Sequence, residues 1–182
     1  PAYAPSGPRP LVLNTGRLRD QWHTMTRTGK SARLAGHRPE PTIEMHPDDA
    51  AGRGLQNGDI ARIESDWGGG VFVAQLSDAV RPGEAFAPMH WTENVSRAAG
   101  VNAAVNPAVD PVSGQPELKH TPVEIRKIDV LWHGTILARR PVMPPDLTYW
   151  THLKGAGFHA YLMAGTQPIV AVRQSLSAAV RA

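Results

Sequence analysis

Two short alternating segments on either side of a glycine run constrain the fold of this chain more than any other feature. Residues 60–65 (IARIES) alternate apolar and polar side chains, which is typical of a strand with one buried face. Residues 71–76 (VFVAQL) are predicted to form the return strand. The glycines at 68–70 can adopt positive φ, as a tight hairpin turn requires. The pattern therefore predicts two antiparallel strands whose apolar face points inward.

Further strands of the same kind occur at residues 11–13 (LVL), 42–45 (TIEM) and 84–89 (EAFAPM). A short helix is expected from Pro47, with acidic residues in its first turn, where the helix dipole favours them. We expect the turn at 54–59 (GLQNGD) to build the fold rather than to contact a ligand. Many short strands, tight Gly/Pro turns and one short helix predict a mainly β protein with a small closed barrel.

The most polar stretch of the chain, residues 14–31 (NTGRLRDQWHTMTRTGKS), directly follows the first strand. It contains three Arg, one Lys and four Thr, and it follows neither a helical nor a strand period. Hydroxyls, guanidinium groups and backbone amides freed by glycine suit a polyanionic, heteroaromatic ligand. A solvated basic loop is the alternative, but the variety of polar types around Trp22 favours a ligand-binding segment.

Two ordered blocks carry a family resemblance. Residues 15–34 (TGRLRDQWHTMTRTGKSARL), continued through 35–65, and residues 110–125 (DPVSGQPELKHTPVEI) resemble the C-terminal cofactor-binding domain of molybdopterin oxidoreductases. Within that superfamily the chain is most similar to the large subunit of bacterial assimilatory nitrate reductase. The resemblance implies a double-psi β-barrel and binding of molybdopterin guanine dinucleotide. The molybdenum itself would be ligated in another domain, so we expect neither catalytic residues nor metal ligands here.

The resemblance also implies the cofactor contacts. A phosphate or pterin edge would meet the hydroxyl, backbone amide and guanidinium of residues 15–17, and residues 22–24 would line the pterin. In relatives an aromatic residue, an Asn and a Lys at the positions of Trp91, Asn102 and Lys119 contact the cofactor, although His90 is as well placed as Trp91. Ala104-Val105 replaces an aliphatic residue and Thr, which removes one expected hydroxyl. The complete expected set is Thr15, Gly16, Arg17, Gln21, Trp22, His23, Thr24, Thr26, Trp91, Asn102 and Lys119.

The expected domain organisation has three parts: a Pro-rich linker at 1–9, the barrel domain at 10–125 and a partly helical extension at 126–182. Residues 129–138 look strand-like. The run from Pro144 to Leu162 looks helical, with Gly155 and Gly157 breaking it into two pieces. The resemblance to assimilatory nitrate reductases implies that the extension is the base of a connection toward an iron–sulfur domain; the alternative is a packing element whose exposed aromatic residues need a partner surface.

Composition excludes several classes. The 182 residues include no Cys, so the chain has no disulfide and no Cys-ligated zinc or iron–sulfur centre. No run approaches the roughly 18–20 apolar residues of a membrane helix, and the start lacks the apolar core of a signal peptide. We therefore expect a cytoplasmic protein without membrane partners. Because the chain begins with Pro1 rather than Met, we expect a fragment or a processed product.

The expected function is therefore cofactor binding within a nitrate reductase. Its partners would be the remaining domains of the same polypeptide and an electron-donor domain or protein. The same domain of a formate dehydrogenase or another oxyanion reductase stays open as an alternative. A nucleic-acid-binding module is disfavoured by the modest net charge of +3 and the absence of a recognisable motif. A stand-alone hydrolase or decarboxylase would need a nucleophile–base pair, and none is visible.

Overall fold

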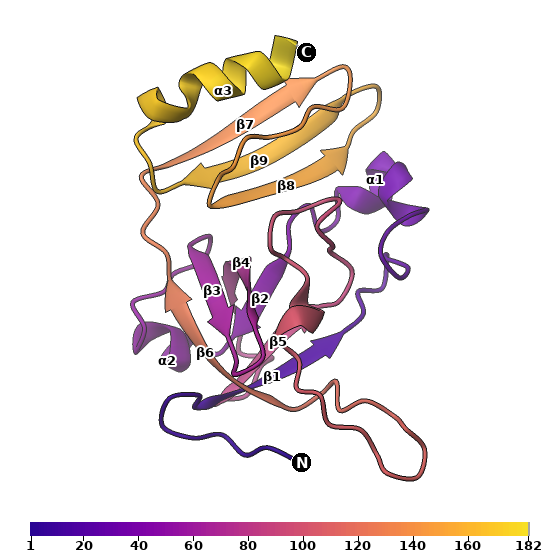
Figure 1. The fold of residues 1–182 in the computed structure, drawn as a ribbon, viewed down its shortest axis with the longest axis vertical. Coiled ribbons are helices and arrows are strands. Elements are labelled where there is room, and N and C mark those ends of the chain that lie inside the picture. The colour runs from indigo at the N-terminus through magenta and orange to yellow at the C-terminus, as the bar shows by residue number, and fades with distance from the viewer. Residues whose placement is uncertain (182) are drawn as a thin grey trace.

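The computed structural model describes residues 1–181 and contains a closed β-barrel and a separate three-stranded sheet (Figure 1). The barrel strands are β1 (Leu11–Gly16), β2 (Thr42–Met45), β3 (Ile60–Glu64), β4 (Gly69–Leu76), β5 (Glu84–Pro88) and β6 (Thr121–Lys127). Short helical segments decorate the barrel: η1 (Thr28–Lys30), α1 (Ala32–Ala35), α2 (Pro47–Ala51) and η2 (Val101–Ala104).

The barrel closes in the order β1-β5-β2-β4-β3-β6, with β6 returning to β1. Two of the pairs, β1 with β5 and β2 with β4, are parallel, and the others are antiparallel. This topology confirms the predicted mainly β fold of double-psi barrel type. Its interior is filled by side chains with no exposed surface, including Leu13, Ile43, Phe72, Val123 and Ile125.

The hairpin predicted around the glycine run is present, since β3 and β4 pair antiparallel through register partners such as Ile63 and Gly70. Ala61 and Ile63 point into the barrel. Ile60 is also buried, but it belongs to a second apolar cluster outside the barrel. The apolar residues of β3 therefore serve both faces, which alternation alone does not show.

The turn before β3 has the structural role that its sequence predicts. Gly58 adopts φ 89°. The Asn57 Oδ1 accepts a hydrogen bond of 2.7 Å from the Leu76 amide, and the Asp59 Oδ2 accepts one of 2.7 Å from the Gln56 amide. These bonds fix the end of β4 to the turn, so the side chains face the fold rather than a ligand.

The C-terminal part forms a sheet of β7 (Trp132–Ala138), β8 (Tyr149–Lys154) and β9 (His159–Gly165), ordered β7-β9-β8 and antiparallel throughout. Figure 1 shows this sheet over the barrel, with α3 (Ile169–Arg181) on the far face of the sheet. Tyr149 and Ala164 pack toward the barrel against Ile60 and Val71. The other face packs against the helix through contacts that include Met163.

The predicted helical run between Pro144 and Leu162 is wrong, because this segment forms the β8–β9 hairpin. Aromatic and β-branched residues at alternate positions fit a half-buried sheet better than a helix. Gly157, at φ 82°, lies in the turn between the strands, so the expected break is a hairpin turn. Tyr149 and Tyr161 are buried at 1% and 3% exposure, so the expectation of exposed aromatic residues is also wrong for them.

Candidate functional site

Strand directions bring three separate chain segments to one end of the barrel. The C-terminal end of β1 lies beside that of β5, since Gly16 and Pro88 are register partners in a parallel pair. β6 runs antiparallel to β1 and begins beside it, at the register pair of Thr121 and Leu13. The loops that follow β1 and β5 and the segment that precedes β6 therefore leave the barrel at the same end. These are the segments that hold the predicted site residues.

The end of β1 and the segment that precedes β6 are joined by direct contacts. Thr15 is buried, and its hydroxyl donates a hydrogen bond of 2.7 Å to the Leu118 carbonyl. The Lys119 ammonium donates to the Thr15 carbonyl. Gly16 packs so tightly that a Cβ there would lie 2.6 Å from a ring carbon of Phe86. Thr15 and Gly16 thus form a packed floor, while the side chains of Arg17 and Lys119 are exposed.

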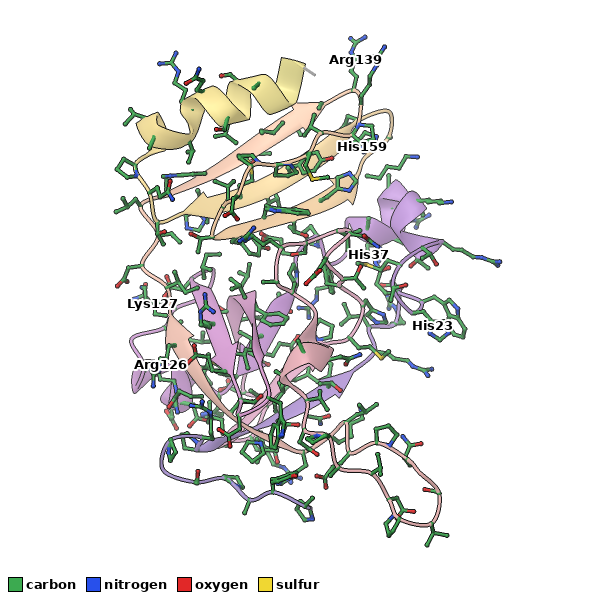
Figure 2. All side chains as sticks on the ribbon, viewed as in Figure 1. His23, His37, Arg126, Lys127, Arg139 and His159 are labelled. Carbon is green, nitrogen blue, oxygen red and sulfur yellow. The ribbon has the colours of Figure 1, made fainter. Side chains whose placement is uncertain are left out.

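The loop after β1 is held together by a buried glutamine. The Gln21 Oε1 accepts a hydrogen bond of 2.7 Å from the Thr28 hydroxyl, and its Nε2 donates one of 3.3 Å to the Leu34 carbonyl. Trp22 is 57% exposed and stands edge-on to His23, with ring centroids 4.6 Å apart. His23 lies on the outside of the molecule, at positive φ (Figure 2). The loop therefore presents these two rings outward from a fixed base.

His90 fixes this loop from the β5 side. The imidazole is fully buried; its Nδ1 donates a hydrogen bond of 2.6 Å to the His23 carbonyl, and its Nε2 accepts one of 2.8 Å from the Leu18 amide. These partners require a neutral ring with its proton on Nδ1. His90 is therefore a structural clamp between the two loops, whereas its neighbour Trp91 lines a cavity.

This cavity, of about 380 Å³, lies between the two loops and β8. Four of the predicted residues line it: Gln21, Thr24, Thr26 and Trp91. Trp91 is only 3% exposed, so its ring forms part of a wall. The apolar part of the lining includes Met25, Ala35, Pro39, Val95 and Leu153.

The remaining predicted residues lie outside the cavity. Arg17, Trp22, His23 and Lys119 are exposed on the loops at the same barrel end, and Asn102 is exposed on η2. Within residues 1–181, no hydrogen bond links the Asn102 side chain to another predicted residue. The structure thus divides the predicted set into a packed floor, a cavity group and an exposed group.

One buried polar residue at this end was missed by sequence reasoning. Asn106 is 3% exposed; its Nδ2 donates 2.9 Å to the His120 carbonyl, and its Oδ1 accepts 2.9 Å from the Ala108 amide. These bonds fix the position of the segment that contains Lys119. The Asn-Pro dipeptide at 106–107 is a turn signal that marks this position.

The exposed surface of the first loop is basic. Within the segment, the only carboxylate is that of Asp20, which is engaged by Arg19 and by His37, whose Nδ1 lies 2.8 Å away. Hydrogen bonds from Arg19 and then from His37 hold the pKa of the Asp20 carboxyl well below its ordinary value. Arg17 and Lys119 have no carboxylate within ion-pair distance among residues 1–181. Two cationic groups are thus available to an anionic ligand.

No grouping of three or more His, Cys, Asp or Glu side chains that could hold a metal ion occurs in the part of the chain that the structure describes. In the same part, no helix is both long enough and apolar enough to cross a lipid bilayer. The donors at the barrel end are hydroxyls, amides, guanidinium and ammonium groups, which suit phosphate and heterocycle edges.

A closed six-stranded barrel with basic and aromatic side chains on the loops at one end is an arrangement that suits an anionic, heteroaromatic cofactor. Comparison with known families agrees: residues 11–122 match the model described as "Molydopterin dinucleotide binding domain". The chain belongs to this family. The resemblance inferred from the two sequence blocks is thereby confirmed.

Curated relatives include several oxidoreductases. The chain is 42% identical to a nitrate reductase of Klebsiella oxytoca over 156 residues, which are 86% of this chain and 18% of that protein. It is 34% identical to the assimilatory nitrate reductase catalytic subunit of Bacillus subtilis, over 69% of this chain and 17% of that protein. It is also 34% identical to the F420-dependent formate dehydrogenase subunit alpha of Methanocaldococcus jannaschii, over 70% of this chain and 18% of that protein. The chain thus spans less than a fifth of the length of these relatives.

Among solved structures, the acetylene hydratase from Pelobacter acetylenicus matches with a TM-score of 0.57 at 19% identity. The match covers 66% of this chain and 18% of that protein. It supports the fold.

Proposed function

We propose that the barrel end built by residues 15–31, 89–105 and 117–120 holds the molybdopterin guanine dinucleotide of a larger molybdenum enzyme. The observation that carries the proposal is the convergence of three distant segments, each with predicted contact residues, at one end of a barrel of this family. Arg17 and Lys119, which have no ion-pair partner among residues 1–181, match the charge of the diphosphate. When bound, the cofactor supplies the oxidation–reduction chemistry, and this chain binds and orients it.

We further propose that the whole enzyme reduces nitrate to nitrite in nitrate assimilation. The 42% identity to a nitrate reductase, over most of this chain, supports this substrate. Formate oxidation is the second candidate, favoured by the 34% identity to a formate dehydrogenase subunit. Assaying the purified full-length enzyme with nitrate and with formate separates the two. Its partners would be the other domains of that enzyme and an electron donor, and its proposed location is the cytoplasm, which cell fractionation tests.

The binding proposal is tested with Arg17→Ala in the full-length enzyme. Removing a charged partner from a buried phosphate contact typically costs about 2–5 kcal/mol, enough to lose the cofactor during purification. The expected result is a loss of molybdenum and of releasable guanine nucleotide per polypeptide. Arg62→Ala is the control, because Arg62 is exposed on β3 and pairs in register with Arg126, which Figure 2 shows on the side of the barrel away from His23.

Thermal melts of both variants separate a binding defect from unfolding. Equal molybdenum content and equal nitrate-reducing activity in the two variants would refute the assignment of Arg17. Loss of activity in the Arg17 variant through a collapsed melting transition would refute it as well.

A further inference from the structure

The extension at 126–182 contributes one wall of the cavity described above. The loop after β1 supplies Met25 and Lys30, the loop after β5 supplies Trp91 and Val95, and the C-terminal end of β8 supplies Leu153 and Lys154. The cavity is thus incomplete without the extension. Its volume of about 380 Å³ lies in the range of small-molecule sites.

The β8 wall is held in register by hydrogen bonds to the loop after β5. The His152 amide donates 2.7 Å to the Val95 carbonyl, and the Arg97 amide donates 2.9 Å to the Trp150 carbonyl. The Thr151 hydroxyl donates 3.2 Å to the same Val95 carbonyl. Because the bonds flank the lining residues, the extension and the barrel loop present one pre-formed surface.

The charges around the cavity are of one sign. Its lining includes the basic residues Lys30, Arg38 and Lys154 and no Asp or Glu. Arg38 already pairs with Glu44 at 3.0 Å, whereas Lys30 and Lys154 have no ion-pair partner among the described residues. Both lysines are exposed, so their ammonium groups lie toward solvent. An apolar cavity with two available cations suits a flat ring that carries an anionic group.

We propose that this cavity binds a fused heteroaromatic ring carrying a phosphate, with the ring between Trp91 and Leu153 and the phosphate at Lys30 and Lys154. The Asn94 amide and the Thr24 hydroxyl, both in the lining, can pair with the amino and oxo groups of such a ring. Guanine and pterin share that ring edge, so either half of the dinucleotide supplies the chemistry. The inference rests on the proposed function and assigns the extension a ligand-binding role within it.

The test is a titration of the 182-residue chain, with amide chemical shifts followed by NMR. Guanosine monophosphate and neopterin phosphate are added separately, with inorganic phosphate as the third probe. The expected result is saturable shifts of the Trp91 and Lys154 amides with at least one ring-bearing probe. That probe identifies which half is bound. Shifts with inorganic phosphate alone, or no shift of these two amides with any probe at millimolar concentration, would overturn the inference.

Lys154→Gln removes the proposed phosphate contact and should weaken binding of the same probe about tenfold, as expected for loss of one charge-assisted hydrogen bond. Arg81→Gln is the matched control, since it removes one exposed positive charge just before β5, at the opposite end of the barrel. Equal affinity of the two variants would overturn the role of Lys154. Lys30→Gln provides an independent second variant with the same expected loss.

Failure of this inference can be distinguished from failure of the proposed function. In the full-length enzyme, guanine nucleotide released per polypeptide is measured for Arg17→Ala and Lys154→Gln. Loss in both supports the two proposals together. Loss only with Arg17→Ala leaves the proposed function standing and refutes the extension as part of the site.

Discussion

Replacing His90 by alanine should release the loop after β1 while leaving the barrel intact. The buried imidazole bridges the Leu18 amide and the His23 carbonyl, through bonds of 2.8 Å and 2.6 Å. Both partners belong to the loop after β1, whereas His90 follows β5. Alanine removes both bonds at once and leaves a cavity where the ring was.

The magnitude follows from these contacts. Two lost hydrogen bonds contribute about 1–3 kcal/mol together, and the space left by a fully buried ring adds about 1–2 kcal/mol. The expected loss of about 2–5 kcal/mol is a large part of the stability of an ordinary domain. His90→Gln retains one donor and one acceptor, and it should recover part of the loss.

The assay combines denaturant unfolding with amide hydrogen exchange. His90→Ala should lower the free energy of unfolding and speed exchange at Leu18. The control is His37→Ala, whose side chain is 45% exposed and which should change stability by less than about 1 kcal/mol. The structural role of His90 would be refuted if His90→Ala left amide exchange at Leu18 unchanged and lowered the free energy of unfolding by no more than the control does.

Two further predictions concern the extension and the hairpin. Burial raises the pKa of Glu40, which accepts a 3.0 Å hydrogen bond from Tyr149, so the folded state holds the Glu40 proton more tightly than the unfolded chain does. The free energy of unfolding should therefore fall as the pH rises from 4.5, the pKa of this side chain in the unfolded chain, through its pKa in the folded state. Urea titrations across this pH range measure that fall, which should be absent in Glu40→Gln. Gly69→Ala would place a Cβ 2.3 Å from the Ile63 carbonyl oxygen and should cost about 1–3 kcal/mol in thermal or urea unfolding. Gly100→Ala, with no atom within 4 Å of the new Cβ, should stay within about 0.5 kcal/mol, and equal losses in the two variants would contradict the packing argument.

The local part of the fold could be predicted because short-range patterns determine it. The β3–β4 hairpin and the turn at Gly58 follow from alternation and from glycines at positions that need them. The β8–β9 hairpin could not be distinguished from a helix, since apolar residues in short segments fit both periods. Burial decided the outcome: Tyr149 and Ala164 pair across strands and cover Ile60 on the barrel.

The sequence names candidate contact residues, but it does not show how they are arranged in space. The predicted contact residues fall in three segments of the sequence, and only the pairing of β1 with β5 and β6 shows that these segments share one barrel end. The sequence could not distinguish His90 from Trp91 as the wall residue, because adjacent residues in an irregular loop have no period. The position of Lys154 in the cavity lining could not be predicted for the same reason as the hairpin, since the strand that carries it was expected to be helical.

Burial also separates two roles within the predicted set, and this determines which substitutions report on ligand binding. Thr15 and Gln21 are buried, and their polar groups bond to the chain itself. Changing either residue would therefore disturb the local structure of the chain itself, whether or not it also removed a ligand contact. The Arg17 side chain is exposed and has no ion-pair partner in residues 1–181, so a folded protein tolerates its loss, whereas the Lys119 ammonium also donates to the Thr15 carbonyl. Lost cofactor in an Arg17 variant, with an unchanged melting transition, can therefore be attributed to the missing contact.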